Sequence, residues 1–489
     1  MTPAHPIQEK LRVLIVTPEL VQFGRGEVAE FSAALASSLV AQGADVRILI
    51  PGHRHVLESL KTKGRAGSLP GLPGIPPAQL IASKTPGGVP LLIIDSVLYQ
   101  QPRAALHRVA PGTQPDDELR FGLLGYVGAL LASDASPLPW RPQVVHCDGW
   151  QSGLAPAYLH FVGGDRAKTI FTAHRVDSAG TFPGSAIQRL GFASVPSAAE
   201  GVTHEGQLSF LKAGWSFADR VAVDSPHYAR ELLDAQRPGS LYATVARRQN
   251  SLTGILHGID IDEWDPEGDP YIDRYYNASR VNAKLENKTA LQRRMGLAGH
   301  PEIPLIGVIA RVGQDLDLRV VAECATAITS LPAQLVVMAA GDSETTRRLQ
   351  ELSRARRGML SVYAGSEESV AHQVVAGADF LLVPAKSDPG GADALYGHHY
   401  GTPPIAHATG GLIDTVLDAA PGSPAAKKAN GFLFAPLSAD AITAAVMRAV
   451  ASYRDRRAYR QLQKAGMVLD VSWDAVGARY MALYREALA

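Results

Sequence analysis

The stretch from Phe380 to Thr415 constrains the fold most, because it contains two strand–loop–helix units in immediate succession. The apolar run from Phe380 to Val383 predicts a short buried strand, and a glycine-containing loop with Asp388 follows it. A second predicted strand, Pro404 to Ala406, leads into the loop Thr409–Gly411 and another helix. Two such units place helix N-termini and glycine backbone at one edge of a sheet, which suits an anionic ligand. Two ordinary turns of a doubly wound sheet would give the same pattern.

The same alternation of strands and helices covers most of the 489 residues, a length that predicts two or three domains. Predicted strands at Arg12–Pro18 and Asp45–Ile50 flank a helical pattern, which is typical of a parallel α/β sheet. The pattern loosens around residues 236–256 and restarts at Leu305. We therefore expect an N-terminal domain over residues 1–253 and a second domain over 254–455, followed by C-terminal helices over 456–489. The Gly- and Pro-rich segment from Gly64 to Pro77 predicts a surface loop.

The composition is that of a soluble globular protein, with 19% charged and 46% hydrophobic residues and a formal net charge of +0. This balance gives no reason to expect nucleic-acid or membrane partners. Two cysteines, Cys147 and Cys324, are too few for a disulfide framework, so a reducing compartment is expected. No signal peptide or membrane-spanning run is recognised, and the expected localisation is cytoplasmic. The oligomeric state stays open.

Several ordered motifs resemble one enzyme family, the bacterial glycogen and starch synthases. The segments that carry the resemblance are Val144–Leu154, Thr172–Pro183, Ser209–Gly214, Gly254–Pro266, Asp388–Ala392, Tyr400–Pro404 and Thr409–Val416. The family implies two Rossmann-like doubly wound α/β domains that face a cleft, the GT-B architecture, with the last helices returning to the first domain. It also implies a glycosyltransferase that moves glucose from ADP-glucose to the non-reducing end of an α-1,4-glucan with retention. A nucleotide sugar and an α-glucan are then the expected partners, and no metal or other cofactor is expected.

The resemblance also assigns roles to individual residues. Arg311, Asp388 and His174 match catalytic positions of the family. A fixed cation such as Arg311 suits this chemistry, because the leaving diphosphate gains negative charge as the glycosidic bond breaks. The positions that match substrate-binding segments are Gly24, Arg25, Gly26, Glu27, Asp148, Tyr396, Thr409, Gly410 and Gly411.

The chain departs from the family pattern at three points. The family lysine in the loop after the first strand is missing, and only Gly24–Glu27 remains of that loop. A second family lysine is replaced by Leu316, and Lys386 and Arg319 are the candidates to substitute for it. Asp388 stands where the family has glutamate, and an aspartate before proline is also an ordinary turn residue. Loss of one cation from such a site typically slows a reaction about a hundredfold or more.

These departures leave two alternatives to an active synthase. In the first alternative, the chain is a catalytically impaired paralogue that acts as a glucan-binding or regulatory protein. In the second, it is a transferase with a different sugar donor. The histidines His398, His399 and His407 do not have a recognisable metal-ligand spacing, so no metal site is assigned to them.

Overall fold

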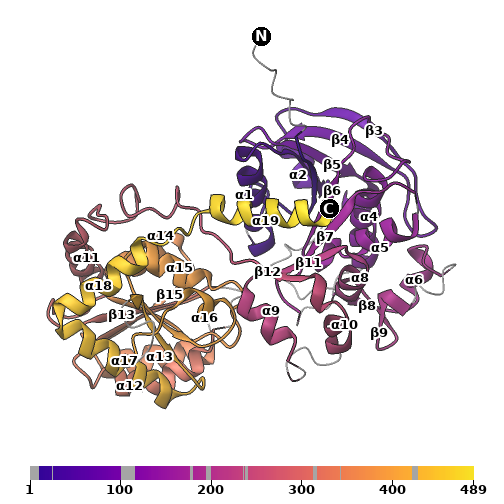
Figure 1. Cartoon of the computed structure of the whole chain (residues 1–489). Coiled ribbons are helices and arrows are strands. Elements are labelled where there is room, and N and C mark those ends of the chain that lie inside the picture. The colour runs from indigo at the N-terminus through magenta and orange to yellow at the C-terminus, as the bar shows by residue number, and fades with distance from the viewer. Residues whose placement is uncertain are drawn as a thin grey trace, which may run out of the picture. The chain divides into compact units, whose positions relative to one another are not determined.

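The computed structural model describes residues 10–24, 26–100, 116–162, 164–176, 180–193, 200–234, 236, 241–311, 316–341, 343–420 and 428–489. The chain divides into two compact units (Figure 1). Unit 1 comprises residues 1–224, 229–255 and 473–489, and unit 2 comprises residues 225–228 and 256–472. The main change from one unit to the other, between Ile255 and Leu256, lies next to the boundary expected after residue 253.

Unit 1 is built on a nine-stranded sheet with the order β12-β11-β7-β6-β1-β2-β5-β4-β3. Its strands are β1 (Arg12–Val16), β2 (Asp45–Pro51), β3 (Gly64–Leu69), β4 (Ala78–Lys84), β5 (Pro90–Asp95), β6 (Val144–Asp148), β7 (Lys168–Thr172), β11 (Arg220–Val223) and β12 (Leu252–Gly254). Neighbouring strands are parallel except for β3 and β4, which form an antiparallel extension of one edge. The loop predicted from Gly64 is therefore wrong over β3. An edge strand tolerates the flanking glycines and prolines because one side of it needs no pairing.

Helices cover this sheet and bury its apolar strands. They are α1 (Glu27–Ala41), α2 (Arg54–Ser59), α3 (Val97–Gln100), α4 (Asp117–Leu131), η2 (Trp150–Ser152), α5 (Leu154–Val162), α6 (Ala186–Arg189), α8 (Phe210–Phe217), α9 (Pro226–Leu232, whose first residues belong to unit 2), α10 (Tyr242–Arg247), η4 (Gln249–Ser251) and α19 (Trp473–Leu488). A small antiparallel sheet is formed by β8 (Thr181–Phe182), β10 (Gln207–Ser209) and β9 (Thr203–His204). The C-terminal helix α19 packs on α1, with Tyr480 edge-on to Phe31 at 5.8 Å between ring centroids.

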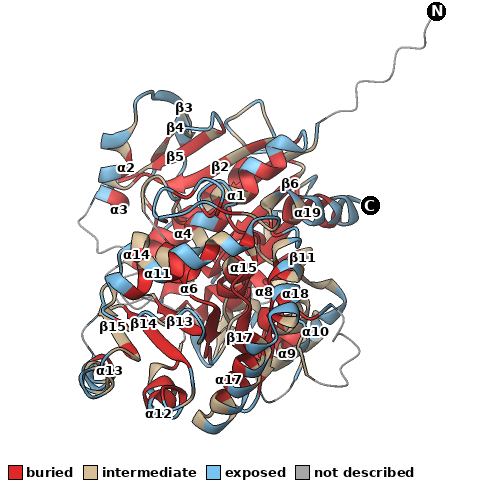
Figure 2. Ribbon diagram, turned by 90° about the vertical axis from the view of Figure 1, so that its left-hand side faces the viewer, coloured by how far each residue is buried: buried red, intermediate tan, exposed pale blue. Residues whose placement is uncertain are grey.

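Unit 2 is built on a six-stranded, entirely parallel sheet with the order β15-β14-β13-β16-β17-β18. Its strands are β13 (Leu305–Ala310), β14 (Gln334–Ala339), β15 (Leu360–Ala364), β16 (Phe380–Val383), β17 (Pro404–His407) and β18 (Phe432–Phe434). Four of these strands, β13, β14, β16 and β17, are almost wholly buried. Figure 2 shows β13, β14 and β17 in red. Burial on both faces explains why they read as continuous apolar runs.

The helices of unit 2 are η5 (Val281–Ala283), α11 (Lys284–Arg294), α12 (Leu318–Ile328), α13 (Glu344–Ala355), α14 (Glu368–Gly377), α15 (Ala392–His399), α16 (Gly411–Thr415), α17 (Ala439–Arg454) and α18 (Arg456–Met467). Helix α18 thus belongs to unit 2, and α19 belongs to unit 1. The C-terminal segment expected over residues 456–489 is divided between the two units at Ser472.

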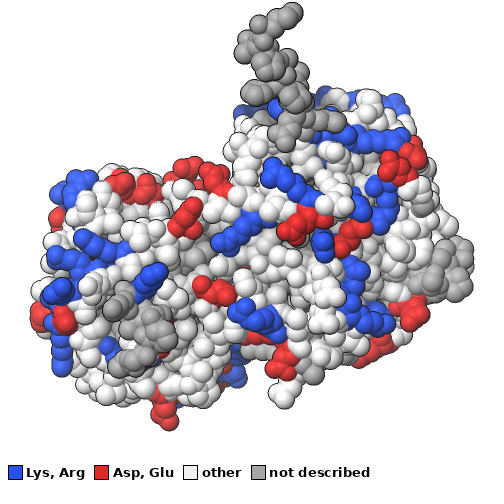
Figure 3. Space-filling view, viewed as in Figure 1, with Lys and Arg blue, Asp and Glu red and all other residues white. Residues whose placement is uncertain are grey.

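The surface fits the neutral composition. Figure 3 shows lysines and arginines interspersed with aspartates and glutamates on the face in view, rather than gathered into a patch of one sign. Over the described residues, no helix combines the length and apolar character needed to cross a bilayer.

Candidate active site

Three neighbouring strands of unit 2 bring predicted site residues to one sheet edge. In the order β13-β16-β17 the strands are parallel, so their carboxyl ends lie together. Arg311 follows β13 directly, the Asp388 loop follows β16, and Thr409–Gly411 follows β17. Ligands of open parallel sheets bind at this edge. The two successive strand–loop–helix units therefore have the arrangement that the sequence predicts.

Arg311 is held by charged and aromatic neighbours. Its Nη1 donates to Asp393 Oδ1 at 3.2 Å, and its Nη2 donates to Glu368 Oε1 at 3.1 Å. The guanidinium lies 5.5 Å from the ring centroid of Trp264 and 5.7 Å from that of Tyr396. Burial alone would lower the pKa of Arg311, but the carboxylates of Asp393 and Glu368 outweigh it and raise the pKa. The guanidinium is therefore a fixed, charged group in a preset orientation.

Asp388 closes the turn that leads into α15. Its Oδ1 accepts a hydrogen bond from the Gly391 N–H at 2.7 Å, and its carbonyl accepts one from the Gly411 N–H at 2.9 Å. The residue is half-buried. This geometry gives Asp388 the role of a turn residue, whether or not its carboxylate also contacts a substrate.

The predicted glycines pack two loops against each other, backbone to backbone. Gly410 has φ of +49°, and a Cβ there would lie 2.2 Å from the carbonyl oxygen of Asp388. A Cβ on Gly411 would lie 2.5 Å from the carbonyl carbon of Gly390. Thr409 is fully buried, and its N–H donates to the His407 carbonyl at 2.9 Å. Glycine at these positions is thus explained by the close approach of the two loops.

The N-terminus of α15 keeps donors available at the same edge. Within the part of the chain that the structure describes, the N–H groups of Ala392 and Ala394 make no hydrogen bond. Unpaired N–H groups and the positive end of the helix dipole together attract anions. Asp393, in the same first turn, is paired with Arg311. This helix start and Arg311 are thus adjacent cationic features.

In unit 1, His174 is clamped between two buried carboxylates. Its Nε2–H donates to Asp148 Oδ1 at 2.7 Å, and its Nδ1–H donates to Asp224 Oδ1 at 2.8 Å. Asp148 Oδ2 also accepts a short hydrogen bond from the Ser32 hydroxyl, and Asp148 is fully buried. Burial alone would lower the pKa of His174, but Asp224 and Asp148 raise it well above the ordinary value. His174 is therefore an imidazolium whose two N–H groups are both engaged.

The loop after β1 lies only partly within the described residues. Gly24 and Gly26 are half-buried, and Glu27 begins α1. A Cβ on Gly26 would lie 3.0 Å from a carboxylate oxygen of Glu19. Arg25, the one predicted cation of this loop, lies outside the described residues.

Several residues around these sites were missed by the sequence analysis. Trp264 was recognised only as part of a motif, although it lies beneath Arg311 and stacks on His372 at 3.6 Å between ring centroids. Asp393 belongs to the helix that follows the Asp388 loop, so its closeness to Asp388 in the sequence could have marked it as a candidate site residue. In the sequence, Glu368 is far from Arg311 and Asp224 is far from His174, the residues that they contact. No local pattern marks either carboxylate.

The histidines near this edge have structural partners. His398 Nε2 donates to the Thr415 carbonyl at 3.1 Å, and His407 Nδ1 donates to the Ala385 carbonyl at 2.7 Å. His398 is buried, and burial lowers its pKa to about 4. It is therefore neutral in the folded protein at pH 7.

His398 is expected to make stability depend on acid pH. Its pKa is about 4 in the folded protein and about 6.5 in the unfolded chain, so the unfolded chain binds more protons between these values. The free energy of unfolding should fall by up to about 3 kcal/mol as the pH drops from 6.5 to 4. His398→Gln keeps a donor for Thr415 and removes the titration. Urea denaturation across this range should give a flatter profile for the variant, and identical profiles would contradict the assignment.

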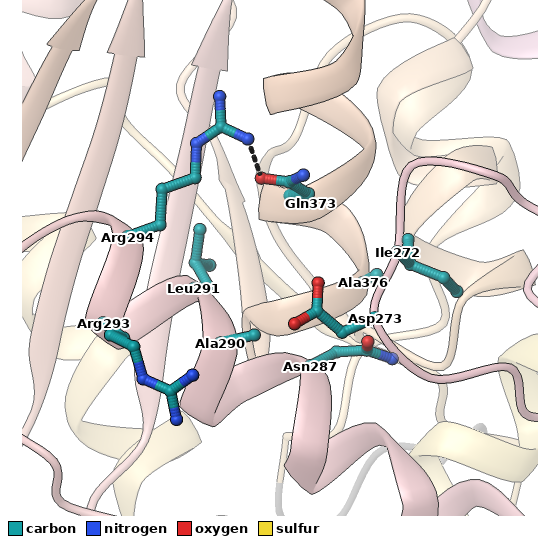
Figure 4. A pocket seen from close by; sticks show the side chains of 9 residues that line it. All are labelled: Ile272, Asp273, Asn287, Ala290, Leu291, Arg293, Arg294, Gln373 and Ala376. Atoms are coloured by element: carbon teal, nitrogen blue, oxygen red, sulfur yellow. Dashed lines mark hydrogen bonds between the residues drawn. The ribbon is translucent and has the colours of Figure 1, made fainter.

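A separate cavity of about 270 Å³ lies in unit 2 against α11 and α14 (Figure 4). Leu291 and Ala376 supply part of its apolar wall, and Arg294 donates to Gln373 Oε1 at 2.5 Å. The described residues that line it include none of the predicted site residues. The cavity is therefore distinct from the candidate active site.

Comparisons with known proteins define the class. The model of the starch synthase catalytic domain matches residues 12–247, and that of group 1 glycosyl transferases matches residues 302–466. The fold resembles the catalytic domain of starch synthase IV from Arabidopsis thaliana bound to ADP and acarbose (TM-score 0.82, 23% identity, 98% of this chain and 100% of that one). A glycosyltransferase from Rickettsia africae resembles it less closely (TM-score 0.55, 15% identity, 98% and 99% covered). The chain is a glycosyltransferase with the GT-B fold.

Curated relatives identify the family. A glycogen synthase of Nitrosospira multiformis is 40% identical over 498 residues, which cover 100% of this chain and 99% of the relative. A glycogen synthase of Nitrosomonas europaea is 40% identical over 487 residues, which cover 98% of each chain. The chain belongs to the bacterial glycogen synthase family, as its motifs predicted.

Proposed function

We propose that this chain transfers glucose from ADP-glucose to the non-reducing end of an α-1,4-glucan with retention of configuration. The bond between glucose C1 and the diphosphate oxygen breaks, and its electron pair stays on the diphosphate. A new bond joins C1 to the acceptor hydroxyl oxygen, whose proton is released. The products are ADP, a glucan longer by one glucose, and one proton.

The observation that supports this proposal best is the charged Arg311 beside the start of α15. The leaving diphosphate gains negative charge, and a preset cation together with open backbone N–H groups stabilises that charge. Tyr396 and Trp264 orient the guanidinium. We assign the donor diphosphate to this edge of unit 2, with Asp388 and the Thr409–Gly411 loop shaping the edge.

For unit 1, we propose that His174, Asp148 and the Gly24–Glu27 loop belong to the substrate-binding surface. Because both N–H groups of His174 donate to carboxylates, its ring is a rigid, charged support. The backbone around it is then better suited than the ring to contact the sugar.

Transfer of labelled glucose to a maltooligosaccharide tests this proposal. The product should lose its label to β-amylase, which trims α-1,4-linked chains from the non-reducing end. EDTA should leave the rate unchanged, because the proposal assigns no metal to the reaction. A panel of nucleotide sugars identifies the donor, and transfer only from a donor other than ADP-glucose would correct that part of the proposal.

A second candidate is a glucan-binding paralogue with little transfer activity. Two observations favour it: the charge of Arg311 is countered by two carboxylates, and Leu316 packs into an apolar cluster instead of supplying a cation. Glycogen binding without transfer from any donor of the panel would support this candidate.

A further inference from the structure

The leaving diphosphate in the proposed reaction needs more positive charge than Arg311 alone supplies. Arg311 lies within hydrogen-bonding distance of Glu368 and Asp393, so two carboxylates counter its single charge. Leu316, near the start of α12, is half-buried and packs on the apolar cluster that also contacts Tyr396. A second cation near the same sheet edge of unit 2 would supply the missing charge.

The chain around Leu316 lies directly against the start of the loop after β16. Leu316 and Ala385 form an antiparallel bridge, and the Asp317 N–H donates to the Pro384 carbonyl at 2.9 Å. Residues opposite each other in such a bridge have Cβ atoms about 5 Å apart. Lys386 follows Ala385 immediately, so it stands one residue from the point where the two segments pair, and its side chain lies beside Asp317.

Two cations gather on Asp317 at this point, and they are held differently. Arg319 donates through Nε and Nη2 to the two carboxylate oxygens of Asp317, at 3.2 and 3.1 Å. Lys386 Nζ lies 3.7 Å from Asp317 Oδ2, beyond hydrogen-bonding distance, and its side chain is 46% exposed. Arg319 thus neutralises Asp317 through two hydrogen bonds, whereas the ammonium of the partly exposed Lys386 side chain forms a longer ion pair with it.

Lys386 also stands on the loop that leads to the donor edge. It is two residues before Asp388, and the turn that Asp388 closes leads directly into α15. We propose that Lys386 is the second catalytic cation, which binds the donor diphosphate and stabilises the charge that develops on it. The proposal rests on the proposed function. It makes the loop after β16 the source of the charge that Leu316 does not provide.

Four variants test this assignment: Lys386→Met, Lys386→Arg, Lys464→Met, and the double change Leu316→Lys with Lys386→Met. We expect Lys386→Met to lower kcat/KM for ADP-glucose about 10- to 100-fold. It should also weaken ADP binding, measured by calorimetry, about tenfold. Lys386→Arg should keep most of the activity, and Leu316→Lys should restore a large part of it. Lys464→Met, the same change on the exposed surface of α18, is the matched control and should stay within about twofold of wild type.

The outcomes separate this inference from the proposed function. Normal transfer and normal ADP binding by Lys386→Met would overturn the role of Lys386 and leave the synthase proposal intact. Equal losses in Lys464→Met and Lys386→Met would also overturn it, because the effect would then not be specific to Lys386. A wild-type protein that binds ADP through Lys386 but transfers no glucose would sustain the inference and refute the transfer activity. A wild-type protein that does not bind ADP would refute both.

Discussion

Arg311→Met is expected to reduce kcat/KM for glucose transfer about 100- to 1,000-fold, the scale of removing one preorganised electrostatic contact. The guanidinium is held by Asp393 and Glu368 and lies against Trp264, so its charge is already oriented before substrate binds. Methionine fills similar space without the charge. Initial rates at several donor concentrations, with ADP affinity by calorimetry, should show losses in both kcat and ADP binding.

Arg448→Met provides a matched control. Arg448 also donates to a carboxylate, Asp418, at 2.9 Å, and also lies over an aromatic ring, Phe432, at 5.5 Å. The variant therefore loses comparable structural contacts on α17, outside the candidate site. A loss of total activity that is similar in both variants and disappears when activity is expressed per folded molecule would show that Arg311 acts only through stability.

His174→Leu is expected to destabilise unit 1 by about 3–5 kcal/mol, because it leaves two buried carboxylates without their shared partner. Asp148 and Asp224 are both fully buried, and each accepts a hydrogen bond from the His174 ring. Chemical denaturation followed by circular dichroism measures the loss. Unchanged stability would contradict the charged network.

His146→Leu is the control for this prediction. His146 is equally buried and also makes two ring hydrogen bonds, but to the hydroxyls of Tyr484 and Thr172. Its removal leaves neutral groups unpaired and should cost about 1–3 kcal/mol.

The two histidines also respond oppositely to pH. The pKa of His174 is raised, so its contribution is complete below pH 6.5 and is lost as the pH rises through the raised value. The pKa of His146 is lowered to about 4, chiefly by burial, so stability falls as the pH drops from 6.5 to 4.

Much of the fold could be predicted because its signals are local. Apolar runs such as Phe380–Val383 and Leu305–Ala310 become fully buried parallel strands. The strand β3 was missed because it lies at a sheet edge and is mostly exposed. Its sequence therefore lacks the alternation of apolar and polar residues that marks a half-buried strand. The division of the last helices, with α18 in unit 2 and α19 in unit 1, depends on packing that no local pattern records.

The candidate site was less predictable, because its electrostatics come from residues far apart in sequence. Family motifs identified Arg311 and His174 but not their partners Glu368 and Asp224, which are 57 and 50 positions away. Glycines 410 and 411 were assigned to ligand binding, and the structure shows that the approach of two loops already requires them. The sequence pattern alone cannot distinguish ligand binding from the close packing of two loops, since both favour glycine, which has no side chain.

The most direct test of the account is the initial rate at which purified protein incorporates labelled glucose from ADP-glucose into glycogen. Wild-type protein should incorporate label, and Arg311→Met should lose nearly all of this activity while it still binds glycogen. No incorporation by wild-type protein from ADP-glucose or any other nucleotide sugar, with glycogen binding intact, would contradict the proposed transfer.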